Sequence, residues 1–390
     1  MTGMGRVPIA DVVGEPSTWN PQDSASREPF KYIDISSIDS VEKTIVHVAT
    51  VSPSEAPSRA RQLVRSGDVL VSTVRPNLNA VAIVPDDLDG ATASTGFAVL
   101  RPDSTSLDSR YLYYWVRTPG FVREMTARAT GASYPAVTDR VVRESRLPLP
   151  PLVEQRRTAA ALDKADAVRR KRRESLRLLD EFLRSAFLEM FGDPVRNEKG
   201  WETRPLGEVA EVERGKFTPR PRNDPRFYDG PYPFIQTGDI AQSDGVVRRW
   251  QQTLNEHGAM VSRQFPAGTI ALAIAANIAD TAIVEFDFYC PDSVVGIVAD
   301  RSSTCSEYLE TCLRFFKPVL AARAPMTAQR NINLQVLRPL RVPMPPLDLQ
   351  ERFRRSRLSA QSLADRMSSH ASGLDGFFDS LSHGAFRGVH

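Results

Sequence analysis

The sequence predicts an α/β (α+β) fold that is built twice, with a mixed domain and a long helix in each copy and the two helices paired as an antiparallel coiled coil. The segment LPLPPLVEQ at 147–155 returns as VPMPPLDLQ at 342–350, and this offset of 195 residues continues without a gap to the ends of both copies. Each copy starts with roughly 150 residues rich in short apolar runs and ends with roughly 40 residues of helical composition. These observations predict an internal pseudo-two-fold repeat.

The first part of each copy has the pattern of short strands separated by turns. Apolar or β-branched runs recur between Gly, Pro, Asn and Asp residues, which is typical of mixed α/β domains. Helical segments are expected near 108–129 and 305–322. The expected strands are 69–74, 80–84, 96–100, 269–275, 281–285 and 293–298.

The second part of each copy has the pattern of one long helix. The pairs Pro150–Pro151 and Pro345–Pro346 end the secondary structure that precedes each helix. No Pro or Gly occurs from Glu154 to Met190. Apolar residues recur at alternating spacings of three and four, which predicts a coiled-coil seam between the two helices. An ordinary helical hairpin inside one globule is the alternative. The expected seam residues are Leu176, Leu179, Leu183, Leu374, Phe378 and Leu381.

The composition excludes wholesale disorder and an acidic protein. The 390 residues are 41% hydrophobic, enough for two or more packed domains, and the formal net charge is +3. The positive charge comes from 43 arginines and only seven lysines. Arginine binds phosphates and guanine edges with paired hydrogen bonds, although the codon bias of a GC-rich genome also explains this excess.

No feature of the sequence predicts a metal, a disulfide or a membrane segment. Cys290, Cys305 and Cys312 have no CxxC spacing, and no apolar run reaches the roughly 18 residues that a membrane span requires. The N-terminus lacks the pattern of a secretory signal. We therefore expect a cytoplasmic protein.

Catalytic motifs are also missing from the sequence. It contains no GxGxxG after a strand, no GxxxxGK[ST] and no HExxH. A duplicated half-unit without such motifs favours a bivalent binding protein that is not an enzyme. Two alternatives stay open at this point: a two-module scaffold for proteins that does not read DNA itself, and an enzyme with an unfamiliar centre.

Several of these segments resemble the type I restriction–modification system DNA specificity (S) subunit. They are PLPPLVEQ, the linker FGDPVRNEKGW at 191–201, LGEVAEVERGKFTPRP at 206–221 and PYPFIQTGDI at 231–240, while YIDISSID at 32–39 is similar to the corresponding block of the first half. Two features depart from the family pattern. The first copy lacks the Trp-led LGEV opening, and Leu349 stands where a Glu usually precedes Gln350.

The resemblance implies a non-catalytic subunit that reads a bipartite, asymmetric DNA site in phage defence. It would position two adenine methyltransferase (modification) subunits and, for cleavage, endonuclease/translocase (restriction) subunits. S-adenosylmethionine, ATP and Mg would belong to those partners, so no cofactor is expected in this chain. The implied parts are target-recognition domain 1 (1–150), spacer helix 1 (151–192), target-recognition domain 2 (193–345) and spacer helix 2 (346–390).

Candidate DNA-binding residues lie in the loops. One loop separates two strand-like runs, and another is a Pro-rich basic loop. The resemblance adds a loop that precedes the helix in each copy. A turn that uses Asn for its backbone angles, a solvated turn and a loop that caps the helix pair are the structural alternatives. In this order the candidates are Arg75, Asn77 and Asn79; Lys216, Arg220 and Arg222; and, implied by the resemblance, Tyr134, Gln329 and Arg330.

Overall fold

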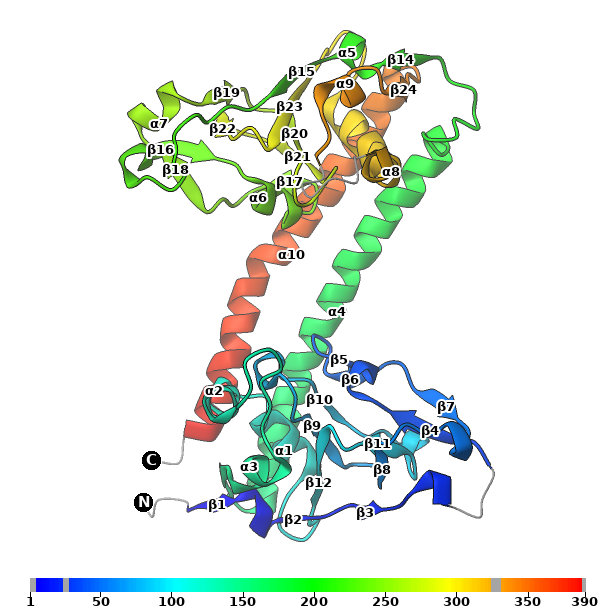
Figure 1. The fold of residues 1–390 in the computed structure, drawn as a ribbon, viewed down its shortest axis with the longest axis vertical. Coiled ribbons are helices and arrows are strands. Elements are labelled where there is room, and N and C mark those ends of the chain that lie inside the picture. The colour runs from blue at the N-terminus through cyan, green and yellow to red at the C-terminus, as the bar shows by residue number, and fades with distance from the viewer. Residues whose placement is uncertain (1–4, 24–27, 324–330, 388–390) are drawn as a thin grey trace. The chain divides into compact units, whose positions relative to one another are not determined.

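The computed structural model describes residues 5–23, 28–323 and 331–387, and it divides the chain into two compact units. Unit 1 comprises Met1–Glu174 and Met367–His390, and unit 2 comprises Ser175–Arg366. The side chains of residues 368–385 and 387 lie outside the described set. There are two long helices, α4 (Leu152–Phe191) and α10 (Leu347–Arg387), and each of them contributes one part of its length to unit 1 and the other part to unit 2 (Figure 1).

The described part of unit 1 contains two larger sheets, two two-stranded sheets and three short α-helices. The first sheet has the order β10-β9-β12-β2 and is antiparallel. The second has the order β3-β8-β11-β4-β7, in which β11 and β4 run parallel. The strands are β2 (Val13–Gly14), β3 (Ser17–Thr18), β4 (Phe30–Ile33), β7 (Ala49–Val51), β8 (Ala60–Leu63), β9 (Val69–Ser72), β10 (Val81–Ile83), β11 (Thr92–Ser94) and β12 (Phe97–Pro102), and a hairpin joins β5 (Ile38–Asp39) to β6 (Thr44–Ile45).

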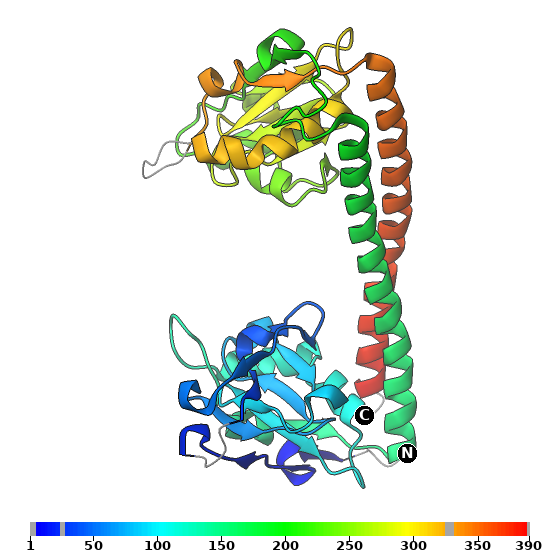
Figure 2. The ribbon, with the colours of Figure 1, turned by 90° about the vertical axis from the view of Figure 1, so that its right-hand side faces the viewer.

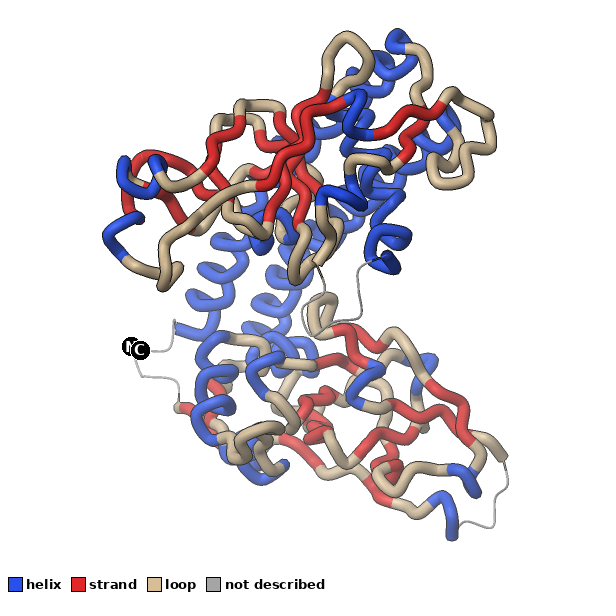
Figure 3. Tube along the Cα trace, turned by 45° about the horizontal axis from the view of Figure 1, so that its top comes forward, coloured by secondary structure: helices blue, strands red, loops and turns tan. Residues whose placement is uncertain are grey.

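Unit 2 repeats this arrangement (Figure 3). Its first sheet has the order β15-β23-β20-β21-β17, which matches β2-β12-β9-β10 with one strand added, and its second has the order β18-β16-β22-β19. The strands are β15 (Ala210–Arg214), β16 (Tyr228–Phe234), β17 (Val246–Val247), β18 (Gln252–Leu254), β19 (Arg263–Phe265), β20 (Thr269–Ala273), β21 (Thr281–Val284), β22 (Phe288–Cys290) and β23 (Val294–Ala299). The short helices are α5 (Leu206–Val209), α6 (Thr237–Ala241), α7 (Glu256–Met260) and α9 (Leu334–Leu337).

The helix that covers the first sheet differs between the units. In unit 2 it is the single helix α8 (Ser306–Arg323), which continues through Pro318. In unit 1 the helix expected over 108–129 is divided into α1 (Ser109–Trp115) and α2 (Pro119–Arg128). The division occurs because Thr118 caps α2 by accepting a hydrogen bond from the Phe121 amide, and a proline follows at the first helical position.

Both units open with the same local structure, although the two sequences differ there. In unit 1, β1 (Arg6–Pro8) pairs with β13 (Arg146–Pro148), which follows α3 (Asp139–Glu144). In unit 2, β14 (Thr203–Pro205) pairs with β24 (Arg341–Pro343). The next residue then donates its amide to a carbonyl of the other chain segment: Ile9 to Ser145 over 2.9 Å, and Leu206 to Leu340 over 2.8 Å. VPIADVVGE at 7–15 therefore takes the place of the LGEV opening that the first copy lacks.

A buried glutamine fixes the start of α4 to unit 1. Gln155 donates to the carbonyls of Pro150 (2.7 Å) and Ser106 (2.9 Å), and its side-chain oxygen accepts from the Asp108 amide (2.9 Å). Tyr111 donates to the Pro148 carbonyl over 3.0 Å. These contacts satisfy polar backbone groups that would otherwise be buried without partners.

Gln350 makes the equivalent contacts at the start of α10. It donates to the carbonyls of Pro345 (2.8 Å) and Ser303 (3.4 Å) and accepts from the Thr304 hydroxyl (2.9 Å). Tyr308 donates to the Pro343 carbonyl over 2.8 Å, as Tyr111 does in unit 1. The repeat therefore extends to individual hydrogen bonds.

The two long helices run antiparallel within each unit (Figure 2). In unit 2, Phe187 and Phe191 near the end of α4 contact Phe353 near the start of α10. In unit 1, Phe386 near the end of α10 contacts α1, through Tyr111 and Trp115. Each unit therefore buries segments from opposite ends of the two helices.

The predicted seam residues are placed only in part. Leu176, Leu179 and Leu183 are half-buried on α4, whereas the neighbouring Leu178 and Phe182 are exposed. The side chains of the other three, Leu374, Phe378 and Leu381, lie outside the described residues. The coiled-coil seam stays a prediction. Among the helices of the described residues, none is both long and apolar enough to span a membrane.

Candidate nucleic-acid interface

A hydrogen-bonded loop with exposed side chains joins β9 to β10 in unit 1. It contains one short 3₁₀ turn, Pro76–Leu78, flanked by two residues with positive φ, Arg75 (49°) and Asn79 (48°). The Leu78 amide donates to the Arg75 carbonyl (2.9 Å), and the Asn79 amide donates to the Pro76 carbonyl (3.0 Å). Pro76 is buried, and the side chains of Arg75, Asn77 and Leu78 are exposed.

A second loop lies against this one. Val74 forms a β-bridge with Ala136, and the Arg75 amide donates to the Pro135 carbonyl over 2.7 Å. The guanidinium carbon of Arg75 lies 4.9 Å from the centroid of the Tyr134 ring, and Tyr134 is 69% exposed. Two candidates that are 59 residues apart in the sequence are thus brought into a cation–π contact at the surface.

Asn79 holds the loop in place and does not project from it. Its amide nitrogen donates to the Val116 carbonyl over 2.9 Å, and its φ is left-handed, which asparagine tolerates better than most residues. Lys43 donates to the carbonyls of Asn79 and Leu78. Burial, assisted by the nearby positive charge of Arg117, lowers the pKa of Lys43 to about 8.

Unit 2 has the corresponding loop between β20 and β21, with different side chains. Ala276 (φ 59°) and Ala279 (φ 63°) occupy the two left-handed positions, and Asn277 lies between them. Ala275 forms a β-bridge with Asn331, which corresponds to the bridge between Val74 and Ala136 in unit 1. Two left-handed positions therefore flank both loops, and the first of them is an alanine in unit 2 where unit 1 has an arginine.

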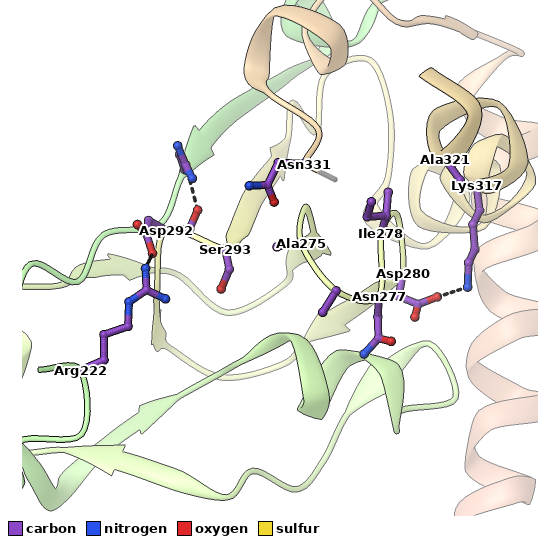
Figure 4. A pocket seen from close by; sticks show the side chains of 12 residues that line it. Arg222, Ala275, Asn277, Ile278, Asp280, Asp292, Ser293, Lys317, Ala321 and Asn331 are labelled. Atoms are coloured by element: carbon purple, nitrogen blue, oxygen red, sulfur yellow. Dashed lines mark hydrogen bonds and ion pairs between the residues drawn. The ribbon is translucent and has the colours of Figure 1, made fainter. Parts of the chain in front are cut away.

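Beside this loop, unit 2 has a groove of about 1030 Å³ with charged walls (Figure 4). On one wall, Arg222 donates to the Asp292 carboxylate over 2.6 Å, and Arg214 donates to the Asp292 carbonyl. On another, Lys317 forms an ion pair with Asp280. The lining residues are Arg214, Arg222, Ala275, Ala276, Asn277, Ile278, Asp280, Asp292, Ser293, Lys317, Ala321 and Asn331.

Two other candidates of unit 2, Arg220 and Lys216, are not part of the groove lining. Arg220 is exposed and lies 4.0 Å from the Asp292 carboxylate. Lys216 is exposed, and its backbone amide donates to the Cys290 carbonyl over 3.0 Å. Gln329 and Arg330 lie outside the described residues. Asp292 therefore brings two of the three residues of the basic loop together.

Several polar residues that line the groove were not among the sequence candidates, including Asn277, Asp292, Lys317 and Asn331. Comparison of the two copies would have found Asn277, because it lies between the two left-handed positions of its loop, as Asn77 does in unit 1. No local signal identifies Asp292 or Lys317, since strand and helix packing bring them to the groove. Among the described residues, no group of three or more His, Cys, Asp or Glu side chains has the arrangement of a metal site.

Comparison with known proteins supports the duplicated fold. In 205 aligned residues the chain is 25% identical to the type I restriction enzyme MjaIX specificity subunit of Methanocaldococcus jannaschii. The alignment covers 49% of the chain and 45% of that relative, so the chain spans about half the length of the curated relative it matches.

Two solved structures have similar folds. One, described as "Structural basis underlying complex assembly and conformational transition of the type I R-M system", is 27% identical, with a TM-score of 0.58 over 100% of this chain and 99% of that chain. The other is the type I restriction-modification system S subunit from M. genitalium, 14% identical, with a TM-score of 0.59 over 98% of this chain and 96% of that chain. The predicted duplicated α/β fold is thereby confirmed.

The family assignment rests on both halves of the chain. The family model of the type I restriction modification DNA specificity domain matches residues 31–177 and again residues 198–353, which together exceed half of the chain. The two matches fall on the two copies of the repeat and include the loops described above. The chain therefore belongs to the family of type I restriction–modification DNA specificity proteins.

Proposed function

We propose that this chain is the non-catalytic specificity subunit of a type I restriction–modification complex. Target-recognition domain 1 (1–150) and target-recognition domain 2 (193–345) each read one half of a bipartite DNA site. Spacer helices 1 and 2 (151–192 and 346–390) bind two adenine methyltransferase subunits and, where the host has them, restriction subunits. S-adenosylmethionine, ATP and Mg²⁺ are bound by those partners.

The observation that carries this proposal is that two units with similar sheet topology present different side chains at and beside the corresponding loop. Unit 1 presents Arg75 and Asn77, and unit 2 presents Asn277 beside Arg222. Arginine and asparagine are the side chains that pair with guanine and adenine edges in the major groove. Similar folds with different side chains at the corresponding loops suit a site whose two halves differ in sequence.

The test is a comparison of methylated adenines in cells that contain or lack this chain. Deletion should abolish methylation of one bipartite, asymmetric motif and leave unrelated methylation unchanged, and expression of the chain from a plasmid should restore that motif. A matched control is the same plasmid with a stop codon early in the reading frame. If deletion changes no bipartite motif, the proposal is wrong.

Salt dependence distinguishes DNA recognition from a protein scaffold. The chain in complex with its methyltransferase should bind a duplex containing the motif, and affinity should fall steeply between about 50 and 200 mM salt because phosphate contacts release counterions. If the methyltransferase alone bound the motif specifically, and if its affinity did not change when this chain was added, the result would support the alternative that the chain is a protein scaffold.

A further inference from the structure

We propose that Arg75 reads a guanine in the half-site of target-recognition domain 1 and that Tyr134 is the positioning residue for its guanidinium group. This inference rests on the proposed function and deepens it, because it names a base and the residue that recognises it. Three observations carry it: the fixed backbone of the loop, the availability of the guanidinium donors, and the residue that replaces Arg75 in unit 2.

The backbone that carries Arg75 is held on every side. Its amide is bound to Pro135, and its carbonyl accepts from Leu78. At the other end of the loop, Lys43 and Val116 hold Asn79 through the backbone carbonyl and the side-chain amide, respectively. A side chain on such a loop loses little backbone entropy when it binds, so the site is preorganised for recognition.

Arg75 is exposed, lies over the Tyr134 ring and has no ion-pair partner among the described residues. In the described part of the chain, no carboxylate or carbonyl accepts a hydrogen bond from it, whereas Arg222 of unit 2 is bound to Asp292. The guanidinium carbon lies over the Tyr134 ring, 4.9 Å from its centroid, and this cation–π contact restrains the group. The contact uses no carboxylate or carbonyl acceptor, and a planar pair of N–H donors matches the O6 and N7 acceptors of guanine.

Unit 2 lacks this contact. Ala276 occupies the left-handed position that corresponds to Arg75, and an alanine side chain cannot donate a hydrogen bond to a base. The two half-sites should therefore differ at this position, and a change at Arg75 should alter only one of them.

The test uses the complete complex in cells, with the methylated motif of each variant determined by sequencing. In Arg75→Ala, one guanine of one half-site should become degenerate, with discrimination there reduced about 5- to 150-fold, while the other half-site is unchanged. Arg75→Lys keeps the charge but loses the planar fork, so it should relax the same position. Arg140→Ala, an exposed arginine of α3, is the matched control and should leave the motif intact.

Tyr134 is tested separately because it acts through Arg75. Tyr134→Phe retains the aromatic ring and should keep the guanine preference, whereas Tyr134→Ala should weaken it at the same position as Arg75→Ala. A merely structural loss would lower methylation of all sequences equally. It would leave the base preference at that position unchanged.

Three outcomes would overturn the inference. One is an Arg75→Ala motif identical to that of the unsubstituted chain. Another is a uniform loss of methylation over all sequences, which indicates a phosphate contact. The third is a half-site without guanine on either strand. Failure of the proposed function is distinguishable, because deletion of the whole chain would then leave every bipartite motif methylated.

Discussion

At the scale of single residues, burial of the Lys43 ammonium group beside the proposed reading loop makes the free energy of unfolding depend on pH. Lys43 lies in the turn between β5 and β6 and binds backbone carbonyls of the loop that ends at Asn79. Desolvation is the main cause that lowers its pKa to about 8, the charge of Arg117 acts in the same direction, and the carboxylate of Asp39 opposes both. The folded chain therefore releases this proton more readily than the unfolded chain.

The predicted consequence is a rise in stability with pH between about 8 and 10.5. In this range the unfolded chain binds more protons at Lys43 than the folded chain does, so the free energy of unfolding increases with pH. Lys43→Met has no titratable group at this position. Relative to this variant, the free energy of unfolding of the unsubstituted chain should increase by about 1 to 2 kcal/mol from pH 7.5 to pH 9.5. Urea unfolding of both proteins at the two pH values measures this gain. Parallel pH profiles would contradict it.

At the scale of elements, each long helix is fastened to its units by charged contacts that the two copies do not share. In unit 1, Asp166 of α4 accepts from Arg117 over 3.1 Å, and Arg173 binds Glu42 in the β5–β6 hairpin over 2.8 Å. Residues 169–173 form a run of five basic residues on α4, and Arg173 thus attaches this run to its own unit. The pairs are stable because each cation meets a carboxylate fixed by other structure.

In unit 2 the corresponding fastening is a buried ion pair. Arg357 of α10 lies 2.6 Å from the carboxylate of Glu310 on α8, and their side chains are 6% and 0% exposed. Arg357 also donates to the hydroxyl of Thr311 over 2.7 Å, and Glu310 accepts from Thr281 over 2.9 Å. In unit 1 the position equivalent to Arg357 is occupied by Leu162, and the position equivalent to Glu310 is occupied by Tyr113. Both side chains are buried.

Removal of one partner should destabilise unit 2 strongly. Arg357→Ala leaves the Glu310 carboxylate buried and unpaired, and we expect a loss of about 3 to 5 kcal/mol. The double variant Glu310→Tyr with Arg357→Leu, which copies Tyr113 and Leu162 of unit 1, should recover a large part of this loss. Thermal and urea unfolding of the three proteins test the expectation. A double variant no more stable than Arg357→Ala would mean that the surrounding packing of unit 2 does not accept the residues of unit 1.

At the scale of the whole molecule, duplication allows the two recognition functions to be independent. Among the described residues, the loop candidates of unit 1 and those of unit 2 contact no common residue, and each set is held by residues of its own unit. Contacts that have no common partner contribute additively to binding. The recognition of one half-site should therefore be separable from that of the other.

The prediction is that Arg75→Ala and Arg222→Ala alter opposite half-sites. Each should cost about 1 to 3 kcal/mol of discrimination if a base contact is lost, and the double variant should show the sum of both effects. Methylation rates of duplexes with single changes in either half, measured with the complete complex, give these values. A substitution that weakens both halves equally would argue against modular recognition.

Much of the fold follows from local patterns in the sequence. The strands expected at 69–74 and 269–275 are β9 and β20, and the prolines before each long helix mark its start. The opening of the first copy was missed, because VPIADVVGE shares only a proline and apolar spacing with its counterpart. The break at Thr118 was also missed, since one cap and one proline are too weak a signal beside a long apolar pattern.

The sequence by itself determined the duplication, the two long helices and the residue types available in the loops, because these depend on composition and on spacing along the chain. Only the tertiary structure decided which loop residues meet. It places Arg75 on Tyr134, commits Asn79 to Val116 and gathers Arg214 and Arg222 at Asp292. The physical reason is that such contacts join residues tens of positions apart, and sheet pairing, which no local pattern encodes, sets their distances.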